Sequence, residues 1–456
     1  MKAAVLTQIP GELEIEEVGV DAPAANEVLV QVVASGLCHS DLHFMEGLWQ
    51  TRLPAVMGHE GAGIVEAVGS DVTYVKPGDH VITCLSVFCG KCRWCLSGHL
   101  SLCDNPGAVG RAKGTAARLT NAQGEQLQQF ARLGAFAEQM LVHENAVVKI
   151  RDEMPLDRAA LIGCGVTTGL GAVFRTARVE PGSEVAVIGA GGIGLAAIQG
   201  ARIAGASKVI AVDVTDQKLD VARQVGATHV VNGSTTDAVE AVKEITGGGV
   251  DFSFEAIGLK QTAEQAWGML RPRGTATIIG MVPFGTKIEI PGHEVFMQEK
   301  VLRGSMMGSN QFRLDMPRFV DHSLDGRLML DEMVSHRIEL EQINHGYDLM
   351  RRRDPSVRRP PIAHENVITV RVVSRRRSRR GGRSRRWWGR RGCGGRTGSS
   401  TTPAGSCSSR RSSAPRSQAS TSPRGSTVCS RRWVRASPHL TTASSASTAR
   451  SSPPSR

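Results

Sequence analysis

Four cysteines stand within fifteen residues, a spacing that suits a metal ion. They are Cys89, Cys92, Cys95 and Cys103. Four thiolates at this spacing can surround Zn²⁺ as a tetrahedron with zinc–sulfur distances of about 2.3 Å. Because every corner is then a thiolate, no corner remains for water, and such a site supports folding. Disulfides or free thiols are the alternatives, but in a cytosolic chain such crowding favours a metal.

A second candidate metal site is dispersed along the chain. Cys38, His59 and Cys164 could supply two thiolates and one imidazole, which would leave the fourth zinc position open for water or substrate. Their polar surroundings support this interpretation: Cys38 opens the stretch CHSDLH, and Glu60 follows His59 directly. Spacing alone does not establish that the three residues converge.

A glycine motif follows one apolar strand pattern and opens a helix pattern. Gly189-x-Gly191-x-x-Gly194 comes after SEVAVI, and its glycines would let the backbone approach a pyrophosphate at a helix N-terminus. The next strand pattern ends at Asp213, whose carboxylate would accept hydrogen bonds from the adenosine ribose and repel a 2′-phosphate. We therefore expect NAD rather than NADP. The alternative is a glycine turn in an α/β domain that binds no dinucleotide.

Two kinds of domain must position these residues. Residues 1–150 show short strand patterns separated by Gly, Pro and Asp turns, which predicts a mostly β domain. From about residue 156, strand and helix patterns alternate, which predicts a doubly wound parallel sheet. The segment after residue 300 is mixed, and we expect it to return to the first domain.

Residues 371–456 differ in composition from the rest. They hold 21 Arg, no Lys and no acidic residue, whereas the whole chain has 55 Lys and Arg against 43 Asp and Glu. The remainder therefore carries a net charge of −9, and a nucleic-acid-binding body cannot be argued from the basic pI. We expect 371–456 to be a disordered Arg/Ser-rich tail. A GC-rich coding strand translated in the wrong frame would give the same bias, so a frameshift product is the alternative.

Taken together, these features resemble the zinc-dependent alcohol dehydrogenases of the medium-chain dehydrogenase/reductase family. GHEGAGIVEAVG (58–69) matches the zinc signature of that family, and CHSDLH, the four cysteines, GCGVTTG and GAGGIG follow its order over about residues 1–360. The resemblance implies an α/β fold. Its mostly β, GroES-like catalytic domain would span 1–160 and be completed by about 301–360, and a doubly wound Rossmann coenzyme domain would span 161–300.

The resemblance also implies roles for single residues. It makes Cys38, His59 and Cys164 the ligands of a catalytic zinc and the four clustered cysteines the ligands of a structural zinc. Ser356-Val357-Arg358 matches a pyrophosphate-binding motif, although PPIAHENVITV follows where the family has a short apolar strand. The other implied roles are catalytic for Ser40, His43 and Glu60, orienting for Asp41, coenzyme-binding for His39, Thr168, Gly189, Gly191, Gly192, Ile193, Gly194, Asp213, Lys218 and Arg358, and substrate-contacting for Trp49 and Leu85.

The implied activity is reversible hydride transfer between an alcohol and NAD⁺, with the proton leaving through Ser40, the cofactor ribose and His43. We expect two zinc ions per subunit, a homodimer or homotetramer, and a cytoplasmic location without a signal peptide or membrane span. Relatives acting on a polyol, threonine or a thiol–formaldehyde adduct remain alternatives. Another is non-specific nucleic-acid binding through the Arg-rich tail. The stretch LTNAQGEQLQQF (119–130) offers no motif that we can interpret.

Overall fold

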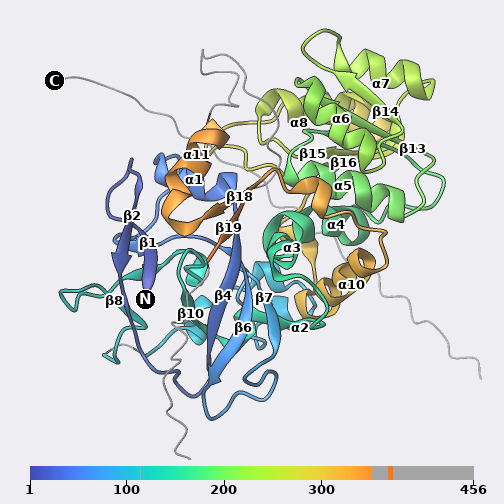
Figure 1. Ribbon diagram of the computed structural model, residues 1–456. Coiled ribbons are helices and arrows are strands. Elements are labelled where there is room, and N and C mark those ends of the chain that lie inside the picture. Colours follow the sequence, from blue (N-terminus) through green and yellow to red (C-terminus); the bar gives the residue numbers. More distant parts are fainter. Residues whose placement is uncertain (113, 352–367, 373–456) are drawn as a thin grey trace, which may run out of the picture. The chain divides into compact units, whose positions relative to one another are not determined.

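Two large sheets form the framework, a mixed seven-stranded sheet and a parallel six-stranded sheet (Figure 1). The structure is a computed structural model that describes residues 1–112, 114–351 and 368–372. The described residues belong to one unit, Met1–Ser378. Arg358 and the predicted tail from residue 373 onward lie outside the described residues.

Strand β4 (Glu27–Leu37) is the centre of the seven-stranded sheet. It pairs antiparallel with β6 (Glu60–Val68), and the last residues of β4 face the first residues of β6. Since β4 ends directly before Cys38 and β6 begins directly after His59, this register brings two candidate ligands to one end of the sheet. The neighbouring strands are β7 (His80–Thr83), β10 (Gln139–His143), β11 (Val147–Lys149), β18 (His336–Glu339) and β19 (Ile368–Arg371).

The sheet is completed from the far end of the described chain. Strand β19 (Ile368–Arg371) lies between β18 and β4, antiparallel to β4 and parallel to β18. Val370 and Val372 are buried at 0% and 2% exposure. The last part of PPIAHENVITV therefore forms a strand, at the position where the family has its short apolar strand. The boundary expected at 371 is also too early, because Arg371 lies in the strand and Val372 in the core.

Small elements surround this sheet. A four-stranded sheet, β2-β1-β5-β9, and a two-stranded sheet, β3-β8, belong to the same part of the chain. The strands are β1 (Lys2–Leu6), β2 (Leu13–Glu17), β3 (Gly19–Val20), β5 (Ala55–Val56), β8 (Leu119–Thr120) and β9 (Gln128–Gln129). The helices are α1 (His39–Met45), α2 (Arg93–Leu96), α10 (Phe312–Leu324) and α11 (Ile343–Arg351). Single 3₁₀ turns occupy Leu100–Leu102, Pro106–Val109, Phe130–Arg132, Glu144–Ala146, Met307–Ser309, Asp331–Met333 and Leu340–Gln342.

The six-stranded sheet confirms the predicted doubly wound domain. Its order is β14-β13-β12-β15-β16-β17, and all neighbours are parallel. This order places a crevice where it reverses, beside β12. The last strand, β17, extends the coenzyme domain beyond the expected boundary at 300. The elements are β12 (Glu184–Ile188), β13 (Lys208–Asp213), β14 (His229–Asn232), β15 (Val250–Glu255), β16 (Leu270–Ile278), β17 (Val301–Gly304), α5 (Gly192–Ile203), α6 (Asp216–Gln224), α7 (Ala238–Thr246), α8 (Lys260–Gly268) and α9 (Gly292–Met297).

One long helical segment packs against both domains. Residues 156–177 share a buried apolar cluster with Ile82 of β7 and with Leu195 of α5. The segment is long and apolar enough to cross a membrane by length and composition alone, but 83% of its apolar window is buried inside the protein. We interpret it as a core helix. It consists of α3 (Leu156–Leu161), the π-helical turn η5 (Ile162–Val166), α4 (Thr167–Gly171) and the π-helical turn η6 (Ala172–Ala177).

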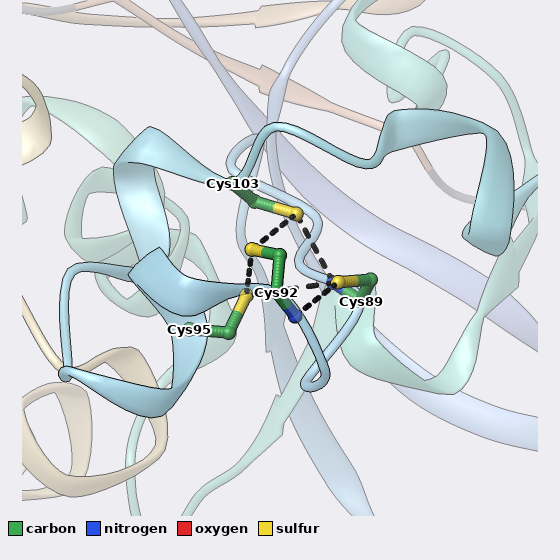
Figure 2. Close-up of side chains that lie close together, drawn as sticks. All are labelled: Cys89, Cys92, Cys95 and Cys103. Atoms are coloured by element: carbon green, nitrogen blue, oxygen red, sulfur yellow. Dashed lines mark hydrogen bonds between the residues drawn. The ribbon is translucent and has the colours of Figure 1, made fainter.

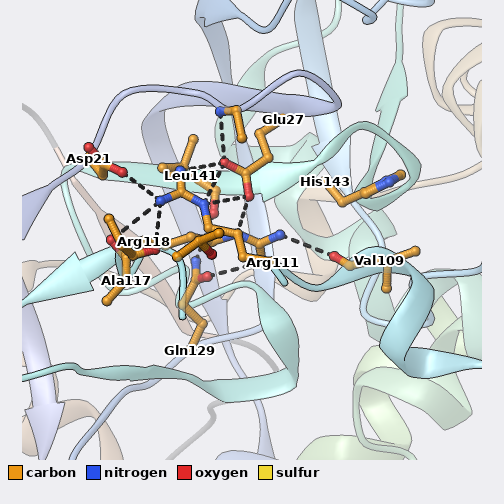
Figure 3. Close-up of polar contacts among 12 residues, drawn as sticks. Asp21, Glu27, Val109, Arg111, Ala117, Arg118, Gln129, Leu141 and His143 are labelled. Atoms are coloured by element: carbon orange, nitrogen blue, oxygen red, sulfur yellow. Dashed lines mark hydrogen bonds and ion pairs between the residues drawn. The ribbon is translucent and has the colours of Figure 1, made fainter. Parts of the chain in front are cut away.

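A buried ion cluster ties the chain after the four cysteines to β4 (Figure 3). The Glu27 carboxylate, 3% exposed, accepts bonds from the guanidinium of Arg111 at 2.6 Å and from that of Arg118 at 2.7 Å. Burial opposes ionisation of Glu27, but Arg111, the Ala24 amide and Arg118 outweigh it and lower its pKa to about 2. Arg111 and Arg118 are thereby fixed to the first residue of β4.

Candidate metal centres and coenzyme site

The four clustered cysteines, which we call the cysteine lobe, face one another (Figure 2). Sγ of Cys92 lies 3.4 Å from Sγ of Cys95 and 4.0 Å from Sγ of Cys103, and Sγ of Cys89 lies 3.9 Å from Sγ of Cys95. A tetrahedron of thiolates around zinc has edges of about 3.8 Å, whereas a disulfide is about 2.05 Å long. The sulfur positions therefore fit zinc and not disulfides, and the described cysteines are free thiols.

Backbone amides favour an anion in the cysteine lobe. The amides of Lys91 and Cys92 donate to Sγ of Cys89 at 3.4 and 3.3 Å. These bonds, that of Lys91 above all, lower the pKa of Cys89 to about 7 against the effect of burial. Burial raises the pKa of Cys95 to about 12. Since four adjacent thiolates repel one another, a dication is what would let all four ionise together.

The dispersed candidates also converge. One donor atom from each of Cys38, His59, Glu60 and Cys164 lies within 4.8 Å of the others, and all but the half-buried Cys38 are buried. Nδ1 of His59 lies 3.0 Å from the carboxylate of Asp41. That contact orients the ring and leaves Nε2 for the metal. We call this group the dispersed cluster.

The electrostatics of the dispersed cluster suit a dication. The pKa of Cys38 is lowered well below its usual value, first by the hydrogen bond from the Cys164 thiol and then by His59. That same bond, with burial, raises the pKa of Cys164. Burial opposes protonation of His59, but Asp41 and Cys38 outweigh it and raise its pKa. The donors are thus two thiols, an imidazole and a carboxyl group, a set that zinc binds in proteins.

Glu60 adds a fourth donor atom to the three candidate ligands indicated by the sequence. The residue is 4% exposed, and burial raises its pKa. Its carboxylate fits there because Gly36 faces it across β4 and β6, and a Cβ at Gly36 would overlap Glu60 Oε2. A substrate oxygen reaching the metal would therefore compete with the Glu60 carboxylate for the fourth position.

Helix α1 carries the predicted proton path. Cys38 is its N-cap, and the Ser40 amide donates to Sγ of Cys38 at 3.4 Å. Ser40 and His43 lie one turn apart on the same face of the helix. The Ser40 hydroxyl donates to Sδ of Met281, from the loop after β16, at 3.4 Å. Nδ1 of His43 is buried and has no hydrogen-bond partner in the described part of the chain, as a group awaiting a cofactor hydroxyl would be.

The glycine loop forms a cradle at the start of α5. Gly189 has a φ of +95°, and a Cβ at Gly194 would overlap the Gly189 carbonyl. A Cβ at Gly191 would meet nothing within 4 Å, so the backbone there borders open space in front of the helix N-terminus. This geometry fits the pyrophosphate of a dinucleotide.

Asp213 ends β13 beside this loop. It is 6% exposed, and its carboxylate accepts bonds from the amides of Ala190 and Val214, each at 2.8 Å. Nζ of Lys218 lies 3.9 Å from the Asp213 carboxylate. The predicted ribose-binding pair is therefore adjacent, and the carboxylate is held in place by the loop that would hold the pyrophosphate.

The other predicted coenzyme residues lie in α1, α4 and α5, except for one. Thr168 is 5% exposed in α4, and its hydroxyl donates to Sδ of Met307 at 3.5 Å. Gly192 begins α5 and Ile193 follows it, partly buried, while His39 is exposed at the start of α1. Arg358 lies outside the described residues.

Several residues at this site escaped the sequence reasoning. The Phe130 ring lies 5.7 Å from that of His59, although Phe130 ends the stretch in which we found no motif. Met281 and Met307 contact the hydroxyls of Ser40 and Thr168 without any spacing signal. No motif or spacing in the sequence could have identified these residues. The predicted substrate-contacting residues Trp49 and Leu85 are both half-buried.

Comparison with known proteins adds to this geometry. Residues 24–152 match the alcohol dehydrogenase GroES-like domain, and residues 192–322 match the zinc-binding dehydrogenase domain. The chain is 38% identical over 359 residues to an alcohol dehydrogenase class-3 of Oryza sativa subsp. japonica, covering 76% of this chain and 93% of that protein.

Solved structures agree in fold. An alcohol dehydrogenase zinc-binding domain protein from Burkholderia ambifaria is 37% identical with a TM-score of 0.77, over 82% of this chain and 99% of that chain. Benzyl alcohol dehydrogenase from Acinetobacter calcoaceticus is 32% identical with a TM-score of 0.74 and the same coverage. A zinc-binding dehydrogenase from Sinorhizobium meliloti 1021 bound to NADP is 30% identical with a TM-score of 0.66, over 81% of this chain and 98% of that chain.

These matches account for both domains. They confirm the resemblance recognised from the sequence, including the GroES-like and Rossmann folds. The chain belongs to the zinc-dependent alcohol dehydrogenases of the medium-chain dehydrogenase/reductase family.

Proposed function

We propose that this enzyme catalyses the reversible oxidation of an alcohol to an aldehyde or ketone with NAD⁺. The observation that carries the proposal is the convergence of Cys38, His59 and Cys164 from three distant segments. Their cluster also meets the coenzyme domain, because the Ser40 hydroxyl contacts Met281 at 3.4 Å. A metal and a nicotinamide could therefore act on the same substrate.

The residues divide the chemistry among them. When bound, zinc supplies a Lewis acid that makes the alcohol hydroxyl more acidic, and the nicotinamide supplies the hydride acceptor. Asp41 holds the His59 ring so that Nε2 points to the metal. Ser40 Oγ would take the proton of the alcohol and His43 would pass it to solvent, and both act from one face of α1.

We further propose two zinc ions per subunit, one in the dispersed cluster and one in the cysteine lobe. Metal analysis of the purified full chain, paired with NAD⁺-linked oxidation of a series of alcohols, tests the whole proposal. We expect two zinc ions and turnover of at least one alcohol. The series should include a polyol, threonine and a thiol–formaldehyde adduct, because exclusive turnover of one of these would favour the corresponding relative. Full activity with a single zinc in the cysteine lobe would refute the proposal.

NAD is the proposed cofactor because Asp213 is a buried carboxylate at the ribose position. Its negative charge would repel a 2′-phosphate, and its three bonds from backbone amides keep it from moving away. Lys218 at 3.9 Å offsets part of that charge. Dissociation constants for NADH and NADPH test the point: we expect NADH to bind more tightly, and the preference to shrink in Asp213→Ser. If the wild type binds NADPH more tightly than NADH, the proposal that NAD is the cofactor is overturned.

The edge of the six-stranded sheet supports a homodimer. Strand β17 has β16 as its one neighbour within the described chain, and all four of its residues are exposed. Exposed apolar side chains flank it, among them Phe296, Met297 and Met306. We propose that two copies pair along β17 about a twofold axis. Leu302→Lys should then give monomers in sedimentation experiments, whereas Leu48→Lys, at an exposed site outside β17, should not.

A further inference from the structure

A file of aromatic rings starts at the dispersed cluster. The Phe130 ring lies 5.7 Å from the His59 ring and 4.8 Å from the Phe44 ring. Phe44 lies 6.2 Å from Trp49, and Trp49 lies 4.4 Å from Phe284. Other ring contacts in the described chain join two or three rings. Only 4% of the residues are aromatic, so this concentration beside one candidate ligand is unusual.

The file leads from the interior to solvent and from one domain to the other. Phe130 is 7% exposed, Phe44 and Trp49 are half-buried, and Phe284 is 82% exposed. Phe284 belongs to the loop after β16, the loop that also brings Met281 to Ser40 at 3.4 Å. Both domains thus contribute to the surface that extends from the cluster.

We infer that these four rings form the surface against which the organic group of the alcohol lies, and that the preferred substrates carry an aromatic ring next to the carbinol carbon. This inference rests on the proposed function, because it concerns the substrate of the same site. It makes Trp49 and Phe284 specificity-determining residues, one from each domain.

Ring chemistry explains the preference. An aromatic substrate can place its positive ring edge against the negative face of a protein ring, a contact that a saturated ring of the same size lacks. The Phe44–Phe130 pair already adopts an edge-to-face arrangement at 68°. Along these rings the indole N–H of Trp49 is the one side-chain donor, so a polyol or the charged ends of threonine would lose most of their hydration there without replacement.

The test is a matched pair of alcohols with the full-length holoenzyme. Benzyl alcohol and cyclohexylmethanol have the same carbon skeleton and differ in aromaticity. We expect kcat/KM for benzyl alcohol to exceed that for cyclohexylmethanol about five- to tenfold. Trp49→Leu and Phe284→Leu should each lower the ratio, and the part that remains reflects the conjugated aldehyde that benzyl alcohol forms. Leu48→Ala, at an exposed neighbour outside the file, should leave it unchanged.

A binding measurement separates this inference from the proposed function. Benzamide and cyclohexanecarboxamide are unreactive analogues whose dissociation constants can be read from protein fluorescence in the presence of NADH. We expect benzamide to have the lower dissociation constant of the two amides, and we expect this difference to disappear in Trp49→Leu. Oxidation of both alcohols with equal kcat/KM, or an unchanged ratio in Trp49→Leu, overturns the inference and leaves the proposed function standing. If the protein binds benzamide more tightly than cyclohexanecarboxamide only when Trp49 is present, but oxidises neither alcohol, the inference about the rings is upheld and the proposed function is overturned.

Discussion

The cysteine lobe and the dispersed cluster hold similar donors in opposite ways. In the lobe, all four donors come from one stretch of fifteen residues, and its backbone amides bond to the Cys89 sulfur at 3.3 and 3.4 Å. In the dispersed cluster, Cys38 follows β4, His59 precedes β6, and Cys164 lies in a π-helical turn of another segment. The lobe is formed within fifteen residues, whereas the dispersed cluster forms only when the whole fold brings its residues together.

The difference concerns what each site can do. A metal in the lobe would be surrounded by four thiolates, so it could only add stability to the segment that wraps around it. The dispersed cluster combines thiols, an imidazole and a carboxyl group between two domains, and the coenzyme domain reaches it through Met281. Ligands drawn from separate elements leave room for a second molecule, which a closed local loop excludes.

Replacing one ligand in each site gives the largest expected contrast. Cys38→Ser should reduce turnover by about 10⁴-fold while the protein keeps its melting temperature within a few degrees. Cys92→Ser should lower the free energy of unfolding by about 4 kcal/mol or more, because the lobe loses a metal ligand. Steady-state kinetics and thermal melts measure both. Equal melting temperatures for the two variants would contradict this division of roles.

Shortening the chain tests how far the dispersed cluster depends on distant segments. A chain that ends after residue 367 loses β19, which pairs with the last residues of β4 directly before Cys38. Loss of the buried Val370 and Val372 should cost about 3–6 kcal/mol. Urea unfolding should show this loss, and metal analysis should show weaker zinc retention in the cluster than in the lobe.

A chain that ends at Val372 is the matched control for that truncation. It should keep both its stability and its activity. Equal stability of the two shortened chains would argue against a structural role for β19. The control also tests the nucleic-acid alternative, because residues 373–456 are absent from it.

Acid should weaken the link between β4 and the chain that follows the lobe. Glu27 has a pKa of about 2 in the folded protein against 4.5 ordinarily, so its contribution of about 3 kcal/mol is complete above pH 4.5 and is lost as the pH falls toward 2. Arg111→Gln removes the main partner. Its stability deficit against the wild type, from urea unfolding, should therefore be largest at neutral pH and narrow below pH 4.5. Arg223→Gln, at an exposed ion pair, should show almost no deficit at any pH.

The smallest effect should come from Asp41→Asn. The buried Asp41 carboxylate lies 3.0 Å from Nδ1 of His59 and orients the ring. We expect zinc affinity in the dispersed cluster to fall about 10- to 100-fold, measured by competition with a chelator, and the lobe to keep its zinc. Asp71→Asn, at an exposed acid outside both sites, serves as the control. Equal loss of both metals would show that Asp41 acts on general stability instead.

The sequence predicted the fold well wherever a local pattern carried the information. Strand and helix patterns from residue 156 onward predicted the parallel sheet, and the cysteine spacing predicted a group that the structure shows facing inward (Figure 2). The sequence did not place the boundaries next to β17 and β19, because these short strands are recognisable only by the strands with which they pair. Phe130 had no pattern at all, since its importance lies in its distance from His59.

Residue types and spacing by themselves indicated the cysteine lobe, the glycine loop with Asp213 and, once the family resemblance was recognised, the three dispersed candidate ligands. Only the tertiary structure decided that a donor atom of Glu60 lies within 4.8 Å of the three candidate ligands, that Met281 contacts Ser40, and that a file of rings extends from His59. The physical reason is distance along the chain. Local contacts depend on the conformation of a few residues, whereas these contacts depend on how β4 pairs with β6 and how the coenzyme domain packs beside them.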